Sequence, residues 1–342
     1  FKCILFFFAY TVLSVSNNIS FSQTKGGLVA FYNLENLFDT IDDPNTNDRD
    51  FLPDGKYTWG TTKYNNKLEN MAKVISKIGD NEEHGIIWGG PTFLGVSEIE
   101  NKQVLEDLIK TPTLKKSNYD IVHFDSPDRR GIDVGFLYRK DYFRVTSAKA
   151  FELVDSTDLE RKTRDQLLVS GIFDGDTLHF IVNHWPSRYA GDEKRVQAAK
   201  LCRSTVDDLL AKNPEAKIFI MGDFNDTPVN KSLNYLVHKS TKRKNKDKSV
   251  TKLYNEGLKW HKKGLGTLCH KDVWQTFDMI IVSPGVLNDK IGFRYKHSGI
   301  HDKPFMHQKD GRFAGYPLRT HAGGNYLNGY SDHFPVYMYI VK

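Results

Sequence analysis

The sequence has little or none of several features that mark specialised classes of protein. Only three of its 342 residues are cysteine, and it has no glycine period or proline-rich tract of the kind that builds fibres. No apolar run after the first 20 residues is long enough to span a bilayer. Aromatic residues make up 13% of the chain, and 48 Lys and Arg face 42 Asp and Glu, a composition that excludes a disordered chain. With no internal repeat and no linker, we expect one globular domain.

The first residues have the pattern of a secretory signal peptide. Lys2 precedes an apolar run of about ten residues, and a small polar stretch follows it. We therefore predict a signal peptide over residues 1–23, a mature domain over residues 24–342, and secretion or export to the periplasm. A buried strand or an uncleaved anchor is the alternative interpretation of the apolar run. In an oxidising compartment Cys202 and Cys269 would form one disulfide or remain two buried thiols.

The basic character of the chain belongs to one segment, residues 238–263. This segment holds ten Lys and Arg residues against Asp247 and Glu256, a net charge of +8, whereas the whole chain carries +6. It has no apolar periodicity up to Val250, which predicts an exposed loop inserted in the domain. The loop is either a solvated insertion or a contact to nucleic-acid phosphates, which clustered basic residues bind by releasing condensed counterions.

Many short strands are interleaved with a few helices along the chain, without a strict βαβ order. Apolar residues recur at helical spacing over residues 63–79, 104–109 and 192–212. Such a set favours an α/β fold in which two packed sheets are flanked by helices. Shorter apolar stretches predict strands at 28–33, 93–97, 120–124, 133–138, 143–151, 166–173, 178–184, 217–222, 277–283 and 335–341.

Polar residues gather where these strands begin or end. Asp223 and Asn225 follow a buried strand and lie on one side of the chain if it stays extended. A carboxylate beside a carboxamide suits a hard cation and a polarised phosphate oxygen. Each polar residue alone is more often a cap, a turn or a buried hydrogen-bonded group than a catalytic residue. The others at strand ends are Asn33, Glu98, Asn183, His184, Asp278, Ser331, Asp332 and His333.

In these residues and in their order, the sequence resembles the endonuclease/exonuclease/phosphatase superfamily, which includes deoxyribonuclease I and exonuclease III. The similarity runs from about Leu28 to Lys342, and segments 183–188 and 330–336 are most similar to the secreted bacterial branch. The resemblance implies a four-layer α/β sandwich of two mainly antiparallel sheets flanked by helices, as in deoxyribonuclease I. It also implies hydrolysis of a phosphate ester that depends on Mg²⁺ or Mn²⁺.

The resemblance further implies how the water is activated. Glu98 would bind the metal, with Asn33 and Asp332 as helpers. His333 would take a proton from the attacking water, and Asp278 would hydrogen-bond to the far nitrogen of its ring. Such a carboxylate fixes the imidazole tautomer and stabilises the imidazolium that forms.

Other residues would act on the phosphate. Asp223 and Asn225 would position the water and the phosphate, or support a second metal ion. His184 would donate a hydrogen bond to a phosphate oxygen as charge develops there. The predicted substrate contacts are Asn183, Arg130 and Arg188.

One segment departs from the family pattern. Several nucleases of the family carry a Tyr in the segment that corresponds here to residues 129–136, but no Tyr occurs in residues 120–137. Arg130 would contact a substrate phosphate instead, or remain a solvated loop residue. Asp133, in the same segment, would orient His184.

Three functions are compatible with this sequence. A secreted nuclease acting on DNA or RNA is favoured by the basic segment and by aromatic residues such as Trp185 and Tyr189. A phosphatase or phosphodiesterase acting on a small phosphate compound or a phospholipid headgroup is the alternative. A non-catalytic binding module is disfavoured because buried acids and imidazoles destabilise a protein that does not use them. We expect a monomer with no stable protein partner.

Overall fold

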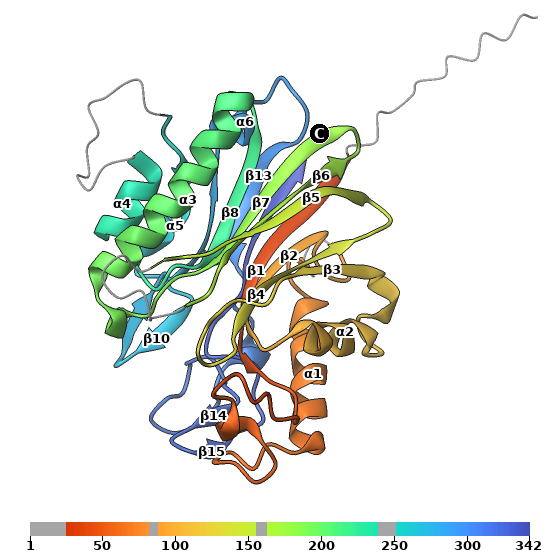
Figure 1. The fold of residues 1–342 in the computed structure, drawn as a ribbon, viewed down its shortest axis with the longest axis vertical. Helices are drawn as coiled ribbons and strands as arrows, with labels where there is room; N and C mark the ends of the chain where they lie inside the picture. The colour runs from red at the N-terminus through yellow and green to blue at the C-terminus, as the bar shows by residue number, and fades with distance from the viewer. Residues whose placement is uncertain (1–24, 82–87, 155–162, 239–250) are drawn as a thin grey trace, which may run out of the picture.

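The computed structural model describes residues 25–342 except 82–87, 155–162 and 239–250. In this part of the chain two six-stranded sheets pack face to face (Figure 1). The first sheet has the order β13 (Arg294–Ile300), β16 (Val336–Val341), β1 (Gly26–Leu37), β2 (Phe93–Ile99), β4 (Asp133–Arg139) and β3 (Tyr119–His123). The second has the order β5 (Phe143–Phe151), β6 (Gln166–Phe173), β7 (Asp176–His184), β8 (Lys217–Asp223), β12 (Asp278–Val282) and β9 (Tyr254–Asn255).

The two sheets are mixed but mainly antiparallel. In the first sheet β1 runs parallel to β2, and in the second β7 runs parallel to β8. The ten strands that the apolar pattern predicts are all present, within a few residues of their predicted bounds. The edge strand β13 was not predicted, because its residues are mostly part-exposed and lack a run of apolar side chains.

The space between the sheets is filled largely by aromatic rings. Phe93 and Phe136 of the first sheet and Phe180 and Phe219 of the second are fully buried in one cluster. The ring centroid of Phe180 lies 4.6 Å from that of Phe93 and 4.9 Å from that of Phe136. Because alternate residues of a strand point to the same face, the strands present these rings to one another. Such close packing gives the strand ends a rigid base.

Helices cover the outer face of each sheet, which completes the predicted four-layer sandwich (Figure 1). The first sheet is covered by α1 (Thr61–Ile75) and α2 (Lys102–Lys110). The second is covered by α3 (Asp192–Lys212) and α4 (Lys231–His238). The described residues also form the short helices α5 (Gly257–Lys262) and α6 (Pro284–Leu287), and the hairpins β10 (Leu268–His270) with β11 (Val273–Gln275) and β14 (His321–Ala322) with β15 (Asn325–Tyr326).

The prediction of an exposed loop over residues 238–263 is wrong for its second half. Residues 239–250 lie outside the described part of the chain, but the following residues form β9 and α5. Leu253 and Trp260 are buried against the body of the protein, whereas Lys259 and its basic neighbours are exposed. The many lysines of this segment make it look uniformly polar, although Leu253 and Trp260 are spaced so that both pack inward.

Three further expectations concern the whole chain. The predicted signal peptide, residues 1–23, lies outside the described residues. No helix in the described part of the chain is long and apolar enough to cross a membrane. Cys202 and Cys269 are both free thiols, of which Cys202 is buried and Cys269 is partly exposed, so they form no disulfide with each other.

Candidate active site

The register of the second sheet aligns three predicted site residues. His184 at the end of β7 is the Cα partner of Asp223 at the end of β8, and Asp223 is the partner of Asp278 at the start of β12. Buried apolar residues hold these three strands in place, among them Val182, Met221 and Ile280. The three polar side chains therefore sit side by side on neighbouring strands.

The first sheet contributes Glu98 from an irregular end of β2. Glu98 has a positive φ of 57° and lies where the pairing of β2 with β4 shifts register between Ser97 and Ile99. A bulge of this kind re-aims a side chain, and a strained backbone is retained where the surrounding structure requires it. Here the side chain of Glu98 points to the second sheet, because its Oε1 lies 3.8 Å from Nε2 of His184.

The predicted pairing of Asp278 with His333 is present. Nδ1 of His333 lies 2.7 Å from Oδ2 of Asp278, and both side chains are buried. The Thr267 hydroxyl donates to the same oxygen of Asp278 at 2.5 Å. Burial alone would lower the pKa of His333, but the negative charges of Asp278 and Asp223 outweigh burial and raise this pKa well above its usual value. The carboxylate thus holds one ring nitrogen and leaves Nε2 for a proton transfer.

Asp223 lies between the two imidazoles. Its Oδ2 is 3.7 Å from Nε2 of His184 and 3.8 Å from Nε2 of His333. The same oxygen accepts a hydrogen bond from Nδ2 of Asn33, and Oδ1 accepts one from the backbone N–H of Asn225. Burial raises the pKa of Asp223 although the positive charge of His333 opposes it. A buried carboxylate held in this way is well placed to position a water or a metal-bound ligand.

His184 is held as a neutral imidazole. Burial lowers its pKa well below the usual value, and the positive charges of Arg164, Arg130 and His333 lower it further. Its Nδ1 is buried and has no hydrogen-bond partner among the described residues. A neutral imidazole with a protonated Nε2 can donate to an anionic oxygen, which agrees with the predicted role.

Glu98 and Asp332 offer carboxylate oxygens, the type of ligand that a hard divalent cation prefers. Oε2 of Glu98 accepts the N–H of Asn36, and Oδ2 of Asp332 accepts Nη2 of Arg319 at 2.6 Å. Each carboxylate therefore has one oxygen fixed by the protein and the other, Oε1 or Oδ1, beside a catalytic imidazole. Both residues line the same cleft. Carboxylate oxygens of this kind fit Mg²⁺ or Mn²⁺ better than a softer metal.

Asn33, the third predicted metal residue, uses both ends of its carboxamide within the protein. Nδ2 donates to Asp223, and Oδ1 accepts the backbone N–H of Glu35 at 2.9 Å. Ser331 donates to its backbone carbonyl at 2.7 Å, and this hydroxyl also accepts the N–H of His333. Asn33 thus ties together the two sheets and the segment that carries His333, and it orients Asp223.

The predicted substrate contact Asn183 is corrected by the structure. Its side chain is fully buried, and Nδ2 faces the backbone carbonyls of Ile181 and Met221 at 3.2 and 3.3 Å. Oδ1 accepts the indole N–H of Trp185 at 3.0 Å. The strand pleat explains this, since neighbouring residues of a strand point to opposite faces. His184 faces the site and Asn183 faces the layer below it.

The two predicted arginine contacts lie in different places. Arg130 lines the cleft, and its backbone N–H donates to Asp128 at 2.9 Å. Arg188 is not among the lining residues; its guanidinium carbon lies 4.7 Å from the ring centroid of Phe277 and its Nε 3.9 Å from Asp226. Arg188 therefore belongs to the surface beside the cleft.

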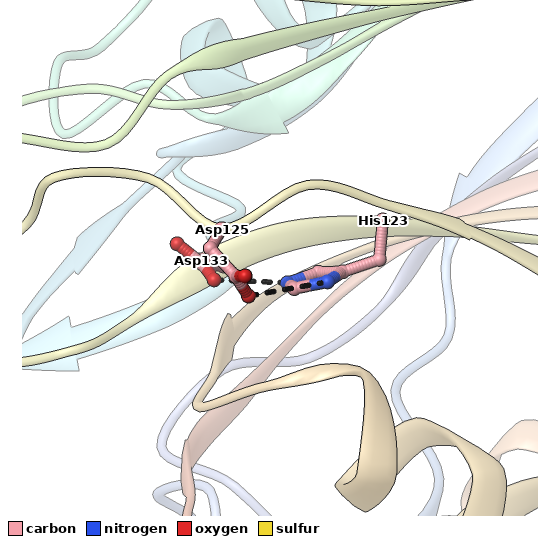
Figure 2. Close-up of side chains that lie close together, drawn as sticks. All are labelled: His123, Asp125 and Asp133. Carbon is pink, nitrogen blue, oxygen red and sulfur yellow. Dashed lines mark hydrogen bonds and ion pairs between the residues drawn. The ribbon is translucent and has the colours of Figure 1, made fainter. Parts of the chain in front are cut away.

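Asp133 does not orient His184, contrary to the prediction from sequence. Its Oδ2 lies 2.9 Å from Nε2 of His123, on the neighbouring strand β3, and Oδ1 accepts both the N–H and the hydroxyl of Ser126. Nδ1 of His123 lies 3.8 Å from the exposed Asp125. Figure 2 shows the three side chains close together. Because every oxygen of Asp133 has a protein partner here, this group fixes the loop after β3.

Several residues near the site have no local sequence signal. Arg319 joins Asp332 to the buried Glu35, to which its Nε donates at 3.2 Å. Thr267 supports Asp278, and the buried Arg164 lines the cleft. Two of them bind groups that are distant in the sequence, since Arg319 and Glu35 are 284 positions apart and Arg164 and Asp128 are 36 positions apart. Only the tertiary structure reveals them.

These residues line a cleft with a cavity volume of about 1410 Å³. Its lining includes two groups of residues in contact with one another. Glu98, His184, Asp223, Asp332 and His333 are linked by distances of 3.7 to 4.0 Å, and Asp128 contacts both Arg130 and Arg164. Acidic and imidazole side chains thus line the cleft together with guanidinium groups. Such a site can hold a cation and an anionic substrate together.

Fold and site together define a phosphoesterase that depends on a divalent metal. The sequence matches the model of the Endonuclease/Exonuclease/phosphatase family over residues 28–342, and the chain belongs to this family. No curated protein matches the chain at a significant level.

Solved structures share this fold at low sequence identity. A family protein from Bacteroides thetaiotaomicron is 20% identical, with a TM-score of 0.52 over 93% of this chain and 98% of that one. The mannosyl-6-phosphatase Bt3783 of the same organism is 19% identical, with a TM-score of 0.53 over 92% and 99%. TDP2 from D. rerio, solved with a single-strand DNA product, is 13% identical, with a TM-score of 0.54 over 92% and 98%.

Proposed function

We propose that this protein is a Mg²⁺-dependent or Mn²⁺-dependent nuclease that hydrolyses phosphodiester bonds of DNA or RNA. The observation that carries the proposal is the cleft, in which carboxylates suited to a cation and guanidinium groups line one space of about 1410 Å³. Sites for small molecules usually enclose about 300–1,000 Å³. A longer polyanion uses the additional volume and the additional positive charge.

The residues divide the chemistry among them. His333 takes the proton of the attacking water in its neutral form, which a bound cation would favour because nearby positive charge lowers the pKa of an imidazole, while Asp278 holds its Nδ1. His184 donates from Nε2 to a non-bridging oxygen as charge develops, and Asp223 and Asn225 position the water and the phosphate. Glu98 and Asp332 would hold the metal ion, which would supply neutralisation of the negative charge that develops in the reaction.

The second candidate is a phosphatase or phosphodiesterase acting on a small phosphate compound or phospholipid headgroup. One observation favours it: none of the described residues 251–263, the second half of the basic segment, lines the cleft. The similarity to a mannosyl-6-phosphatase is compatible with it. The same metal centre would serve either substrate, because the fold does not choose one.

A substrate panel separates the two candidates. Purified protein is incubated with plasmid DNA, RNA, sugar phosphates and phospholipids, each with Mg²⁺ and with EDTA. The nuclease proposal predicts cleavage of polynucleotide that requires Mg²⁺ and falls steeply as salt rises, because phosphate contacts release counterions. Turnover of the small compounds without cleavage of either polynucleotide would contradict it.

We also propose that the enzyme works outside the cytoplasm. The support is the N-terminal pattern of Lys2 and the apolar run after it. N-terminal sequencing of the protein recovered from the periplasm or the medium tests this. A new terminus near residues 22–24 is expected, and an intact Lys2 in the cytoplasmic fraction contradicts it.

A further inference from the structure

We propose that Arg164 and Arg130 form a second phosphate-binding subsite in the wall of the cleft, next to the catalytic centre. The subsite would take the phosphate that neighbours the scissile one in a polynucleotide. This inference deepens the nuclease proposal and rests on it. Neither arginine belongs to the set that binds the metal or activates the water.

Arg164 is a buried cation that lines the cleft. Its side chain is only 8% exposed. Nη1 donates to Oδ2 of Asp128 at 3.1 Å, and Nη2 donates to the backbone carbonyl of Trp185 at 2.8 Å. Nε is buried and has no hydrogen-bond partner in the part of the chain that the structure describes. A guanidinium with an unused donor is costly to bury. Because the group has five N–H donors, Nη1 and Nη2 keep N–H groups beyond these two hydrogen bonds, and these can donate to an anion in the cleft.

The cluster of Asp128, Arg130 and Arg164 has more positive than negative charge. Asp128 is buried and serves both arginines, because its Oδ1 also lies 3.9 Å from Nε of Arg130. One carboxylate therefore faces two guanidinium groups, which leaves the cluster with an excess of positive charge. Arg130 has a half-exposed side chain and lines the same cleft. A planar guanidinium pair is a strong and geometrically specific partner for phosphate.

Arg164 lies next to the residues of the catalytic centre. The carbonyl of Trp185 accepts from Arg164 at 2.8 Å and from Nδ2 of Asn225 at 3.0 Å. Arg164 is therefore joined to the catalytic centre through one shared acceptor atom. This atom is the carbonyl oxygen of Trp185, the residue that follows His184 in the chain. The buried Asp128 fixes it there from the other side. A phosphate bound to this guanidinium would lie beside the scissile phosphate, as the next phosphate of a strand does.

Two probes that differ only in phosphate number test the subsite. Isothermal titration calorimetry in EDTA compares the binding of the dinucleotide TpT with that of its doubly phosphorylated form pTpTp. For the wild-type protein we expect pTpTp to bind at least about tenfold more tightly, since charged hydrogen bonds to phosphate are strong. Arg164→Gln and Arg130→Gln should each reduce this ratio to about threefold or less. Arg144→Gln, an exposed arginine of β5, should retain it.

Several results would overturn the subsite. These are an equal affinity of the wild type for both probes, an unchanged ratio in Arg130→Gln, or an equal loss for both probes in Arg164→Gln. The last would place Arg164 at the scissile phosphate itself. If Arg164→Gln does not fold, the half-exposed Arg130→Gln decides. If the wild type shows the ratio but cleaves no polynucleotide with Mg²⁺, the nuclease proposal fails and the subsite stands.

Discussion

Asp278 and His333 are 55 residues apart in the sequence, yet Oδ2 of Asp278 lies 2.7 Å from Nδ1 of His333. Asp278 begins a buried strand of the second sheet, and His333 lies shortly before β16 of the first, which begins at Val336. The contact therefore joins the two sheets across the site. It fixes which nitrogen of the imidazole faces the cleft, and the account of catalysis depends on it.

Replacing Asp278 with Asn should lower kcat by about 10²–10⁴-fold. An amide can hold the ring in place, but it no longer selects the right tautomer or stabilises the imidazolium. KM should change little, because Asp278 has no contact with substrate. Steady-state kinetics on a phosphodiester check this, with Asp272→Asn as control, since Asp272 is exposed. A KM effect with unchanged kcat would contradict the assigned role.

Replacing Glu98 with Gln should weaken metal binding. The change removes one negative charge from the site and leaves an oxygen that is a poorer ligand for a hard cation. We expect the Mg²⁺ concentration that gives half-maximal activity to rise at least about tenfold, and EDTA to abolish activity in both proteins. Glu106→Gln, at a part-exposed position of α2, serves as control. An unchanged Mg²⁺ dependence would remove Glu98 from the metal site.

Replacing Asn183 with Ala should affect stability rather than substrate binding. The substitution leaves the indole N–H of Trp185 and two backbone carbonyls without their partner. Unsatisfied buried groups of this kind cost about 1–3 kcal/mol each, so the free energy of unfolding should fall by at least this amount. Denaturant unfolding and KM measured on the folded fraction check this. A raised KM with unaltered stability would restore the contact predicted from sequence.

His301 should make the fold sensitive to acid. Burial, aided by Lys303 and Lys77, lowers the pKa of His301 from 6.5 to about 3. Between these values the unfolded chain binds a proton and the folded protein does not, so stability falls as pH falls below 6.5. From pH 7 to pH 5 this contributes a loss of ~2 kcal/mol.

The variant His301→Gln should lack this contribution. Its free energy of unfolding should change less between pH 7 and pH 5 than that of the wild type, by about the same ~2 kcal/mol. The exposed His270→Gln is the matched control. Equal pH dependence in His301→Gln and the wild type would show that His301 does not carry this effect.

The sequence predicted the two-sheet architecture and most of the polar cluster. Buried strands such as 217–222 are continuous apolar runs. A charged residue directly after such a run is expected at the strand end, because burying its charge within the strand would be costly. The alignment of His184, Asp223 and Asp278 then follows from the sheet register. Helix α3, with its regular apolar spacing, has the bounds 192–212 that the sequence predicted.

The sequence could not predict which face a polar side chain occupies or which distant group it meets. Asn183 and His184 are adjacent and both polar, but the pleat turns only His184 to the cleft. Asp133 meets His123 because β3 pairs with β4, a pairing that no local pattern encodes. Arg164 is held in place by a hydrogen bond to Asp128, which is 36 residues away in the sequence. Such relationships depend on long-range packing.

The most direct test of the central claim compares the wild type with His333→Ala in the hydrolysis of bis(p-nitrophenyl) phosphate, with Mg²⁺ and with EDTA. The claim is that carboxylates and imidazoles from both sheets act as one metal-dependent phosphoesterase centre. We expect turnover by the wild type only with Mg²⁺, and a rate at least about 10³-fold lower in folded His333→Ala. A His333→Ala rate close to that of the wild type, or wild-type turnover that persists in EDTA, would contradict the account.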